Sequence, residues 1–163
     1  MEINFKVSVL LIGILCTGLT SGLCFTWANA VTPGIGDLDD LSFLRSFQAM
    51  NRSIINGPFL FVFFSPAIIL FVNSYLFKTS DVSFWLFLAA AILYFVGIGL
   101  VTIFGNVPLN EILDKVNLDN LSSFELKELR TKFEQPWNQW HMVRSCTSIL
   151  SFFFLLLGLL YIK

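Results

Sequence analysis

The chain has 163 residues, of which 56% are hydrophobic, 16% aromatic and 13% charged, and its formal net charge is −1. Soluble domains carry about 25% charged residues, so this composition excludes an ordinary soluble enzyme and a disordered segment. The near-zero net charge provides no electrostatic basis for binding nucleic acid. The length is that of a single domain.

Four long uncharged stretches divide the chain. They lie between Lys6 and Asp37, Arg52 and Lys78, Asp81 and Glu111, and Arg144 and Lys163. A helix needs about 20 mainly apolar residues to cross a bilayer. We predict membrane-spanning helices at 6–28, 57–77, 83–105 and 142–162. Because the backbone must hydrogen-bond to itself in hydrocarbon, the predicted fold is an all-α, four-transmembrane-helix bundle, a single membrane domain over residues 1–163.

We expect a multi-pass integral membrane protein, in a bacterial inner membrane. One alternative stays open for the first stretch, since Ala28-Asn29-Ala30 resembles the cleavage site of a secretory signal. The apolar core of such a signal is about 7–15 residues long. The stretch from Val7 to Phe25 is longer, which favours a membrane span.

The connection between the first two spans is predicted to hold a turn and then a helix near 40–55. Proline and glycine residues at 33–36 indicate the turn. Asp39 or Asp40 can cap the helix that follows. Apolar residues recur there at helical spacing, so one face of this helix should lie on the bundle or in the membrane interface. Pro66 can kink the second span.

The connection between the last two spans is predicted to hold helices near 107–116 and 123–134. Asn106 can cap the first of these. Ser122-x-x-Glu125 has the pattern of a capping box at the start of the second. We expect that helix to stop before Pro136, because proline interrupts helical hydrogen bonding.

Polar residues gather at one end of the predicted bundle. The end of the first span, the start of the second, the end of the third and the start of the fourth share one leaflet. These places hold Thr26, Asn29, Asn51, Arg52, Asn56, Thr102, Asn106, Trp137, Trp140, His141 and Arg144. An unpaired amide or guanidinium at membrane depth costs several kcal/mol, so we expect one shared polar cluster.

Helical spacing places these residues on two stripes. The first consists of Trp137, Trp140, His141 and Arg144, at i, i+3, i+4 and i+7, and the second of Thr102, Asn106 and Asn110. Two such stripes at one depth can line a ligand cavity between helices. The structural alternative also stays open, because interfacial tryptophans form aromatic belts, arginines near helix ends extend to water, and asparagines cap helices.

Metal and thiol chemistry find little support in the sequence. The three cysteines, Cys16, Cys24 and Cys146, contain no C-x-x-C pair, which argues against a thiol oxidase. His141 is the only histidine, so a haem held by two histidines of one chain is excluded and a zinc site lacks its cluster of ligands. We expect neither a metal nor another cofactor.

Four groups of motifs, in this order on four spans, carry a family resemblance. They are VTPG at 31–34 with QAMNR at 48–52, NGPF at 56–59, VTIFGNVPLN at 101–110 and WNQWHMVR at 137–144. With these motifs the chain resembles the anthrone oxygenase-like (DUF1772) family of integral membrane proteins over almost its whole length. The blocks at 101–110 and 137–144 are the most specific parts of the match.

The resemblance implies a small four-helix membrane protein. Some fungal members oxidise an anthrone to an anthraquinone with dioxygen, without metal or flavin. The recurring polar residues of the family would map to Asn51, Arg52, Thr102, Asn106, Asn110, Trp137, Trp140 and Arg144. Many members carry asparagine where this chain has His141, so the resemblance does not by itself imply a mechanism based on histidine.

These observations lead to a set of expected site residues. The catalytic candidates are His141, Arg144 and Arg52, and the substrate-binding candidates are Asn51, Thr102, Asn106, Asn110, Trp137 and Trp140. An anthrone must lose a C–H proton, after which its enolate can react directly with dioxygen. The site must supply an apolar slot, a base and stabilisation of the enolate oxygen. His141 could be the base, because imidazole exchanges protons near neutral pH.

The expected function is oxidation or binding of a planar hydrophobic molecule of the polyketide or quinone type. The alternative is a non-enzymatic accessory subunit, or a lipid- or ligand-binding component of a membrane complex, because the phenylalanine-rich second and fourth spans can face lipid or another subunit. The expected partners are a small hydrophobic molecule or lipid and the membrane. A protein partner or homo-oligomer stays open, and no nucleic acid is expected.

Overall fold

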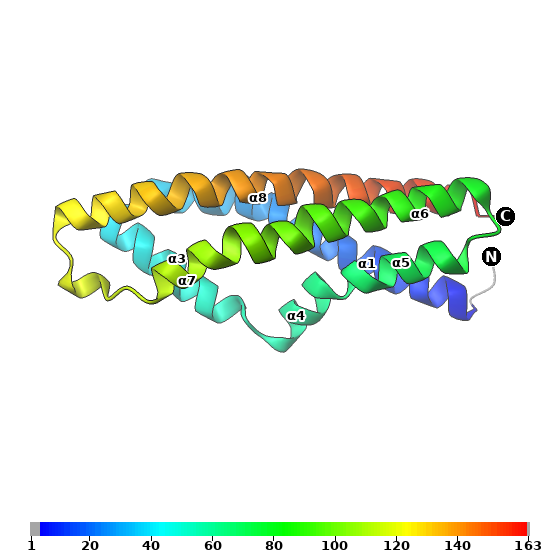
Figure 1. Cartoon of the computed structure of the whole chain (residues 1–163), viewed down its shortest axis with the longest axis horizontal. Helices are drawn as coiled ribbons and strands as arrows, with labels where there is room; N and C mark the ends of the chain where they lie inside the picture. The colour runs from blue at the N-terminus through cyan, green and yellow to red at the C-terminus, as the bar shows by residue number, and fades with distance from the viewer. Residues whose placement is uncertain (1–3, 163) are drawn as a thin grey trace.

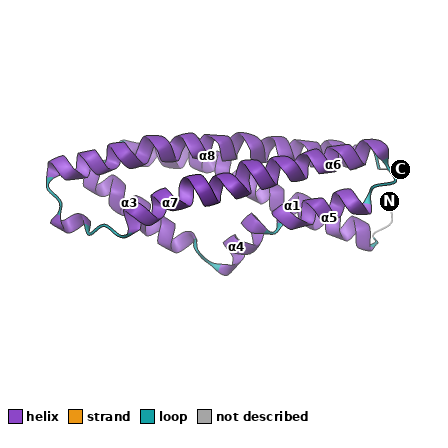
Figure 2. Cartoon of the chain, viewed as in Figure 1, coloured by secondary structure: helices purple, strands orange, loops and turns teal. Residues whose placement is uncertain are grey.

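The computed structural model describes residues 4–162, which form helices and short connections with no strand among them. Figure 1 shows an elongated bundle in which long helices lie side by side, and Figure 2 shows how short the connecting loops are. The α-helices are α1 (Phe5–Thr26), α2 (Thr32–Gly36), α3 (Asp40–Ile54), α4 (Gly57–Phe64), α5 (Pro66–Leu76), α6 (Asp81–Tyr94), α7 (Val107–Asp114) and α8 (Ser123–Leu160). The π-helical segments are η1 (Trp27–Val31), η2 (Phe95–Leu100) and η3 (Thr102–Asn106), and η4 (Leu118–Asn120) is a 3₁₀ turn.

Four helical stretches are long and apolar enough to cross a membrane. They are Phe5–Gly36, Gly57–Leu76, Asp81–Asp114 and Ser123–Leu160. The first and third stretches contain the predicted spans 6–28 and 83–105 completely. The second and fourth contain the predicted spans 57–77 and 142–162 except for the last one or two residues. The prediction of an all-α, four-helix membrane bundle is therefore confirmed, and the protein is a multi-pass membrane protein.

The first span is longer than predicted. The proline- and glycine-rich residues 33–36 form α2 and continue the helix through η1, so the predicted turn was wrong. Pro33 lacks an N–H and would clash with the carbonyl four residues back in a regular α-helix. The wider π-helical turn just before it shifts that carbonyl, which lets the chain remain helical.

Two further predicted helix breaks, at Asn106 and just before Pro136, were also wrong. The third span runs through η2 and η3 directly into α7, and Asn106 makes no capping hydrogen bond. In the last segment α8 continues through Pro136 for 38 residues, about 57 Å. A proline inside a helix costs about 3 kcal/mol, and the packing of α8 against α1, α3 and α6 offsets this cost.

Several local predictions are confirmed. Asp39 caps α3 by accepting a hydrogen bond from the Ser42 N–H at 3.0 Å. Ser122 and Glu125 form the reciprocal capping box of α8. The second span bends at Pro66, where α4 ends and α5 begins, and α4 tilts away from the line of α5 (Figure 1).

Two separate groups of buried side chains hold the molecule together. The membrane core joins α1, α4, α5, α6 and α8 around Tyr94, Phe87 and Leu10. The second core joins α3, α7, η4 and the first half of α8 around Phe43, Phe47 and Phe133. We call these latter elements, residues 40–54 and 107–136, the cap. The functional candidates lie where the two cores meet.

Candidate functional site

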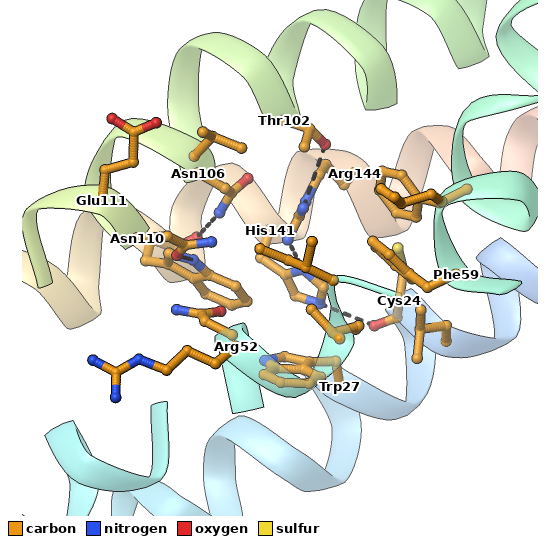
Figure 3. A pocket seen from close by; sticks show the side chains of 18 of the residues that line it. Cys24, Trp27, Arg52, Phe59, Thr102, Asn106, Asn110, Glu111, His141 and Arg144 are labelled. Carbon is orange, nitrogen blue, oxygen red and sulfur yellow. Dashed lines mark hydrogen bonds between the residues drawn. The ribbon is translucent and has the colours of Figure 1, made fainter. Parts of the chain in front are cut away.

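A cavity of about 390 Å³ lies between the membrane core and the cap. The walls come from the end of α1 with η1, the end of α3, α4, η3 with α7, and α8. This volume is within the range of small-molecule sites, about 300–1,000 Å³. The walls are mainly apolar, and a few polar side chains converge on them (Figure 3).

Eight of the nine predicted site residues line this cavity. They are Asn51, Arg52, Thr102, Asn106, Asn110, Trp137, His141 and Arg144. They come from α3, from the η3–α7 stretch and from α8, so three separate segments contribute. The polar face expected on the third span is kept through η3, although this segment is π-helical.

Trp140 is the predicted site residue that lies outside the cavity lining. It is 44% exposed and covers Gly105, where an added Cβ would lie 2.7 Å from the Cγ of Trp140. On a helix of 100° per residue, Trp140 is at the edge of the stripe formed by Trp137, His141 and Arg144. It therefore packs α8 against the third span.

Three other residues of the expected polar cluster also lie elsewhere. Thr26 and Asn29 are exposed, on a different face of the first span. Asn56 is exposed and caps α4 by accepting a hydrogen bond from the Phe59 N–H at 3.0 Å. Selecting residues by polarity alone thus assigned these three to the wrong face.

Trp137 connects the cap to the cavity. The indole N–H donates to Oδ1 of Asn110 at 2.7 Å, and the backbone carbonyl of Trp137 accepts from Nδ2 of Asn106 at 3.1 Å. The indole also stacks on the His141 ring, with centroids 4.9 Å apart and planes 17° apart. Two hydrogen bonds and a stacking contact therefore fix this aromatic wall.

His141 has both ring nitrogens engaged (Figure 3). Nδ1 lies 2.7 Å from Nη2 of Arg144, and Nε2 lies 3.0 Å from the carbonyl oxygen of Cys24. A guanidinium only donates and a carbonyl only accepts, so Nδ1 is the acceptor and Nε2 carries the proton. The ring is neutral in this arrangement. To act as the expected base, His141 would have to release one of these hydrogen bonds.

Arg144 is nine-tenths buried, with 8% of its surface exposed. Nη1 donates to Oγ1 of Thr102 at 3.3 Å, and Nη2 donates to His141. Nε, in contrast, is buried without a hydrogen-bond partner among residues 4–162. The two terminal nitrogens thus hold the guanidinium in place, while the third donor position has no partner among these residues.

Three further buried polar atoms on cavity-lining residues lack a partner within the described part of the chain. They are Nε1 of Trp27, Nδ2 of Asn51 and Oδ1 of Asn106. Together with Nε of Arg144, they form a set of three donors and one acceptor. Leaving a buried donor or acceptor unpaired costs about 1–3 kcal/mol, so this set favours a bound molecule that carries acceptor oxygens.

Arg52 lies at the mouth of the cavity. Its Nε donates to Oδ1 of Asp114 at 2.6 Å, and its side chain is 61% exposed. Figure 3 shows the guanidinium extending away from His141 and Arg144. The structure thus places Arg52 in an ion pair between α3 and α7, which differs from the expected role at the reacting centre.

The mouth has a polar side and an apolar side. Charged residues of α7, Glu111 and Asp114, lie on the first, and exposed apolar residues of α4, Leu60 and Phe64, lie on the second. The mouth therefore joins a charged surface on α7 to an apolar surface on α4.

Sequence reasoning missed the contribution of the first span. Cys24 and Trp27 line the cavity, and the Cys24 carbonyl anchors His141. A signal was present, since Thr17, Thr20 and Cys24 recur at intervals of three or four on one face of α1 and are all buried. The apolar residues Phe59 and Phe63 of α4 were missed because no polar pattern marks them.

Within residues 4–162, no group of three or more histidine, cysteine, aspartate or glutamate side chains is arranged to hold a metal ion. The polar groups of the buried lining are amides, indoles, a hydroxyl, a thiol, the imidazole of His141 and the guanidinium of Arg144, and other charged side chains lie at the mouth. Such groups can orient an aromatic molecule, donate hydrogen bonds to its oxygens and stabilise negative charge on them.

Comparisons with known proteins agree with this arrangement. A family model described as anthrone oxygenase matches residues 50–154, about two thirds of the chain. The matched segment contains all nine predicted site residues, while Cys24 and Trp27 precede it. Neither the curated proteins nor the solved structures give a match. Because the family model covers well over half of the sequence, the chain belongs to the anthrone oxygenase family.

Proposed function

We propose that the cavity binds a planar hydrophobic molecule of the anthrone or quinone type and that the protein oxidises it with dioxygen. The observation that carries this proposal is the buried Arg144, which lines an aromatic, mainly apolar cavity and whose Nε–H has no partner among residues 4–162. The family assignment supports the same chemistry.

The walls suit a flat aromatic molecule. The stacked pair of Trp137 and His141 supplies a broad ring surface, and Trp27 lies 5.9 Å from Trp137 between ring centroids. Phe59 and Phe63 of α4 supply further apolar surface of the cavity wall. Aromatic rings favour offset or edge contacts with one another, so these walls can hold a fused-ring substrate without a covalent link.

The proposed reaction needs few protein groups. The substrate CH₂ group loses a proton, and the electron pair spreads onto the carbonyl oxygen as an enolate, which Arg144 and Asn51 stabilise through donated hydrogen bonds. The enolate carbon bonds to dioxygen and, after protonation, becomes a hydroperoxide. Loss of the remaining C–H proton and cleavage of the O–O bond give a ketone and water. One oxygen atom enters the product, the other enters water, and dioxygen is the oxidant.

His141 serves as a positioning residue in this scheme. It holds Nη2 of Arg144 through its Nδ1 lone pair, while the Cys24 carbonyl holds its Nε2–H. An anthrone ionises easily because its anion is fully aromatic, so water at the cavity mouth can accept the proton. The protein then contributes orientation, exclusion of bulk water and stabilisation of the enolate.

Dioxygen consumption by the purified protein in mild detergent tests the proposal. With a model anthrone, the wild type should consume one dioxygen per anthraquinone formed, well above the rate in empty micelles. Arg144→Met should lower kcat/KM about 100-fold, the usual effect of losing an oxyanion donor. The matched control Arg52→Gln should retain most of the rate. A wild-type rate equal to that of empty micelles would exclude the activity.

Binding without turnover is the second candidate. The unpaired polar atoms on the cavity walls favour a ligand whether or not it reacts. A pigment or lipid that co-purifies and is recovered unchanged, with no dioxygen consumption, would support this candidate. A protein that co-purifies in stoichiometric amount would support an accessory subunit.

A further inference from the structure

Arg144 differs from the other three arginines of the chain in its surroundings. The other three lie in the cap and each contacts a carboxylate, in the pairs Arg45 with Asp119, Arg52 with Asp114 and Arg130 with Asp40. Within the part of the chain that the structure describes, Arg144 forms no ion pair. It is also the most deeply buried cation, between the membrane core and the cap.

The titratable groups around Arg144 leave its charge uncompensated. His141 accepts a hydrogen bond from the guanidinium and is therefore the neutral imidazole. Cys24 lines the cavity as a buried thiol, and its carbonyl is occupied by His141. Of the carboxylates at the mouth, Asp114 pairs with Arg52 and Glu111 lies 4.0 Å from Lys115.

A buried cation without a counter-charge is costly. Removing an ion from water costs several kcal/mol even after relaxation, and this is recovered when a partner of opposite charge is present. A charged residue in the membrane interior that lacks such a partner therefore points to a functional site. The remaining partner for Arg144 is the molecule that enters the cavity.

We infer that the cavity binds its ligand as an anion, a planar phenol or enol that has lost its proton and whose oxygen is neutralised by Arg144. The inference rests on the proposed function and specifies its substrate class. Planar molecules with an ionisable oxygen are selected, and neutral analogues of the same shape bind more weakly. Binding itself then promotes the ionisation that the reaction requires.

Donors on three cavity-lining residues have no partner among the described residues. Nε of Arg144 comes from α8, Nδ2 of Asn51 from α3 and Nε1 of Trp27 from η1. Hydrogen bonds to an ionised oxygen are about twice as strong as those between neutral groups. The low dielectric of the surrounding apolar walls strengthens the attraction to the guanidinium further.

The test uses alizarin, a hydroxyanthraquinone dye whose absorption moves to longer wavelength when its phenol ionises. Quenching of tryptophan fluorescence reports binding independently of colour. Bound to the full-length protein in detergent, the dye should ionise at a pH at least one unit lower than in empty micelles, a tenfold or greater preference for the anion. The dimethyl ether of alizarin, which cannot ionise, should bind at least tenfold more weakly.

Variants assign the effect to Arg144. Arg144→Gln should bring the ionisation midpoint of the bound dye back to its value in micelles, while Arg144→Lys should keep part of the shift. Arg45→Gln, the matched control at an arginine of the cap outside the cavity lining, should leave the shift unchanged. If Arg144→Gln does not fold, the comparison of alizarin with its dimethyl ether on the wild type still decides the question.

The outcomes separate this inference from the proposed function. Dye that binds with an unshifted midpoint, or an ether that binds as tightly as the phenol, would overturn anion binding while leaving planar-ligand binding intact. A shift that Arg45→Gln abolishes and Arg144→Gln does not would also overturn it. Failure of both alizarin and anthrone to bind would overturn the inference and the proposed function together.

Discussion

The two ends of the bundle each bury an asparagine completely, in different surroundings. Asn106, at the cavity end, donates from Nδ2 to the Trp137 carbonyl and presents an unpaired Oδ1. At the other end, neither amide atom of Asn73 has a partner within residues 4–162, and an added Cβ at Gly13 would lie 2.6 Å from its Nδ2. Both amides are costly to bury, and Asn106 lines the cavity together with Trp27, Asn51 and Arg144, which carry further donors unpaired among the described residues.

Hydroxyl groups in the membrane core form hydrogen bonds between helices, which is a structural role. Ser151 donates to the Ala90 carbonyl at 2.8 Å, and Ser83 donates to the Gly158 carbonyl at 3.0 Å. Such bonds link α8 to α6 as polar contacts commonly link membrane helices. The comparison shows that polar content alone does not identify a site in a membrane bundle. What distinguishes the candidate site is a set of unpaired polar groups, from several helices, on residues around one cavity.

Replacing each of the two asparagines separately with leucine tests this difference between the ends most strongly. Asn106→Leu should weaken alizarin binding at least tenfold and lower the free energy of unfolding by about 1–3 kcal/mol, because the amide bridge from the third span to α8 is lost. Asn73→Leu should leave binding unchanged and stability equal or higher, because it removes an unpaired amide. Dye titration and thermal unfolding in detergent measure both effects. Similar losses in the two variants would contradict the distinction between the ends.

The hydrogen bonds that link Arg144, His141 and the Cys24 carbonyl provide a second test at the cavity end. His141→Ala should lower the oxidation rate about tenfold, because Arg144 loses the acceptor that fixes Nη2. His141→Gln should restore much of the rate, since glutamine can accept from Arg144 and donate to the Cys24 carbonyl. If His141 were the base, both variants should be equally inactive, and the pH–rate profile would lose its ascending limb in each.

A glycine at the far end should affect stability alone. An added Cβ at Gly158 would lie 2.5 Å from Cε1 of Phe87, so Gly158→Ala should lower the free energy of unfolding by about 1–3 kcal/mol through overpacking. Dye binding per folded molecule should not change. Gly22→Ala is the matched control, because nothing lies within 4 Å of its added Cβ, and it should be neutral or slightly stabilising. A loss of dye affinity in Gly158→Ala would show that the two ends are coupled.

The smallest expected effect concerns acid sensitivity in the cap. Hydrogen bonds from Ser42 hold the pKa of Asp39 below its usual value. This carboxylate therefore stabilises the folded state above its unfolded pKa, about 3.9, and the contribution is lost as pH falls through the folded pKa. Asp39→Asn keeps the capping oxygen and removes this dependence. Thermal unfolding at pH 7 and pH 3 should show a smaller acid-induced decrease in Tm for the variant, and an equal decrease would exclude the assignment.

The candidate site could be predicted in part. The i, i+4 spacing of Thr102, Asn106 and Asn110 and the stripe on α8 correctly identified side chains that share a cavity. The prediction did not distinguish Trp140 from Trp137, because both belong to the same broad helix face. Which edge of that face meets a neighbour depends on the rotation of α8 against the third span, where Gly105 makes room for the Trp140 ring.

Local sequence patterns determined the four spans, the cap helices and the N-terminal caps at Asp39 and Ser122, because bilayer thickness and local hydrogen bonding act over short stretches of chain. Tertiary structure alone decided whether the helices continue through Pro33 and Pro136, because packing energy from distant segments competes with the local cost of proline. It also decided which distant groups Arg52 and His141 contact. The partners of these two side chains lie 62 and 117 residues away in sequence, in Asp114 and Cys24, and no local pattern encodes such distances.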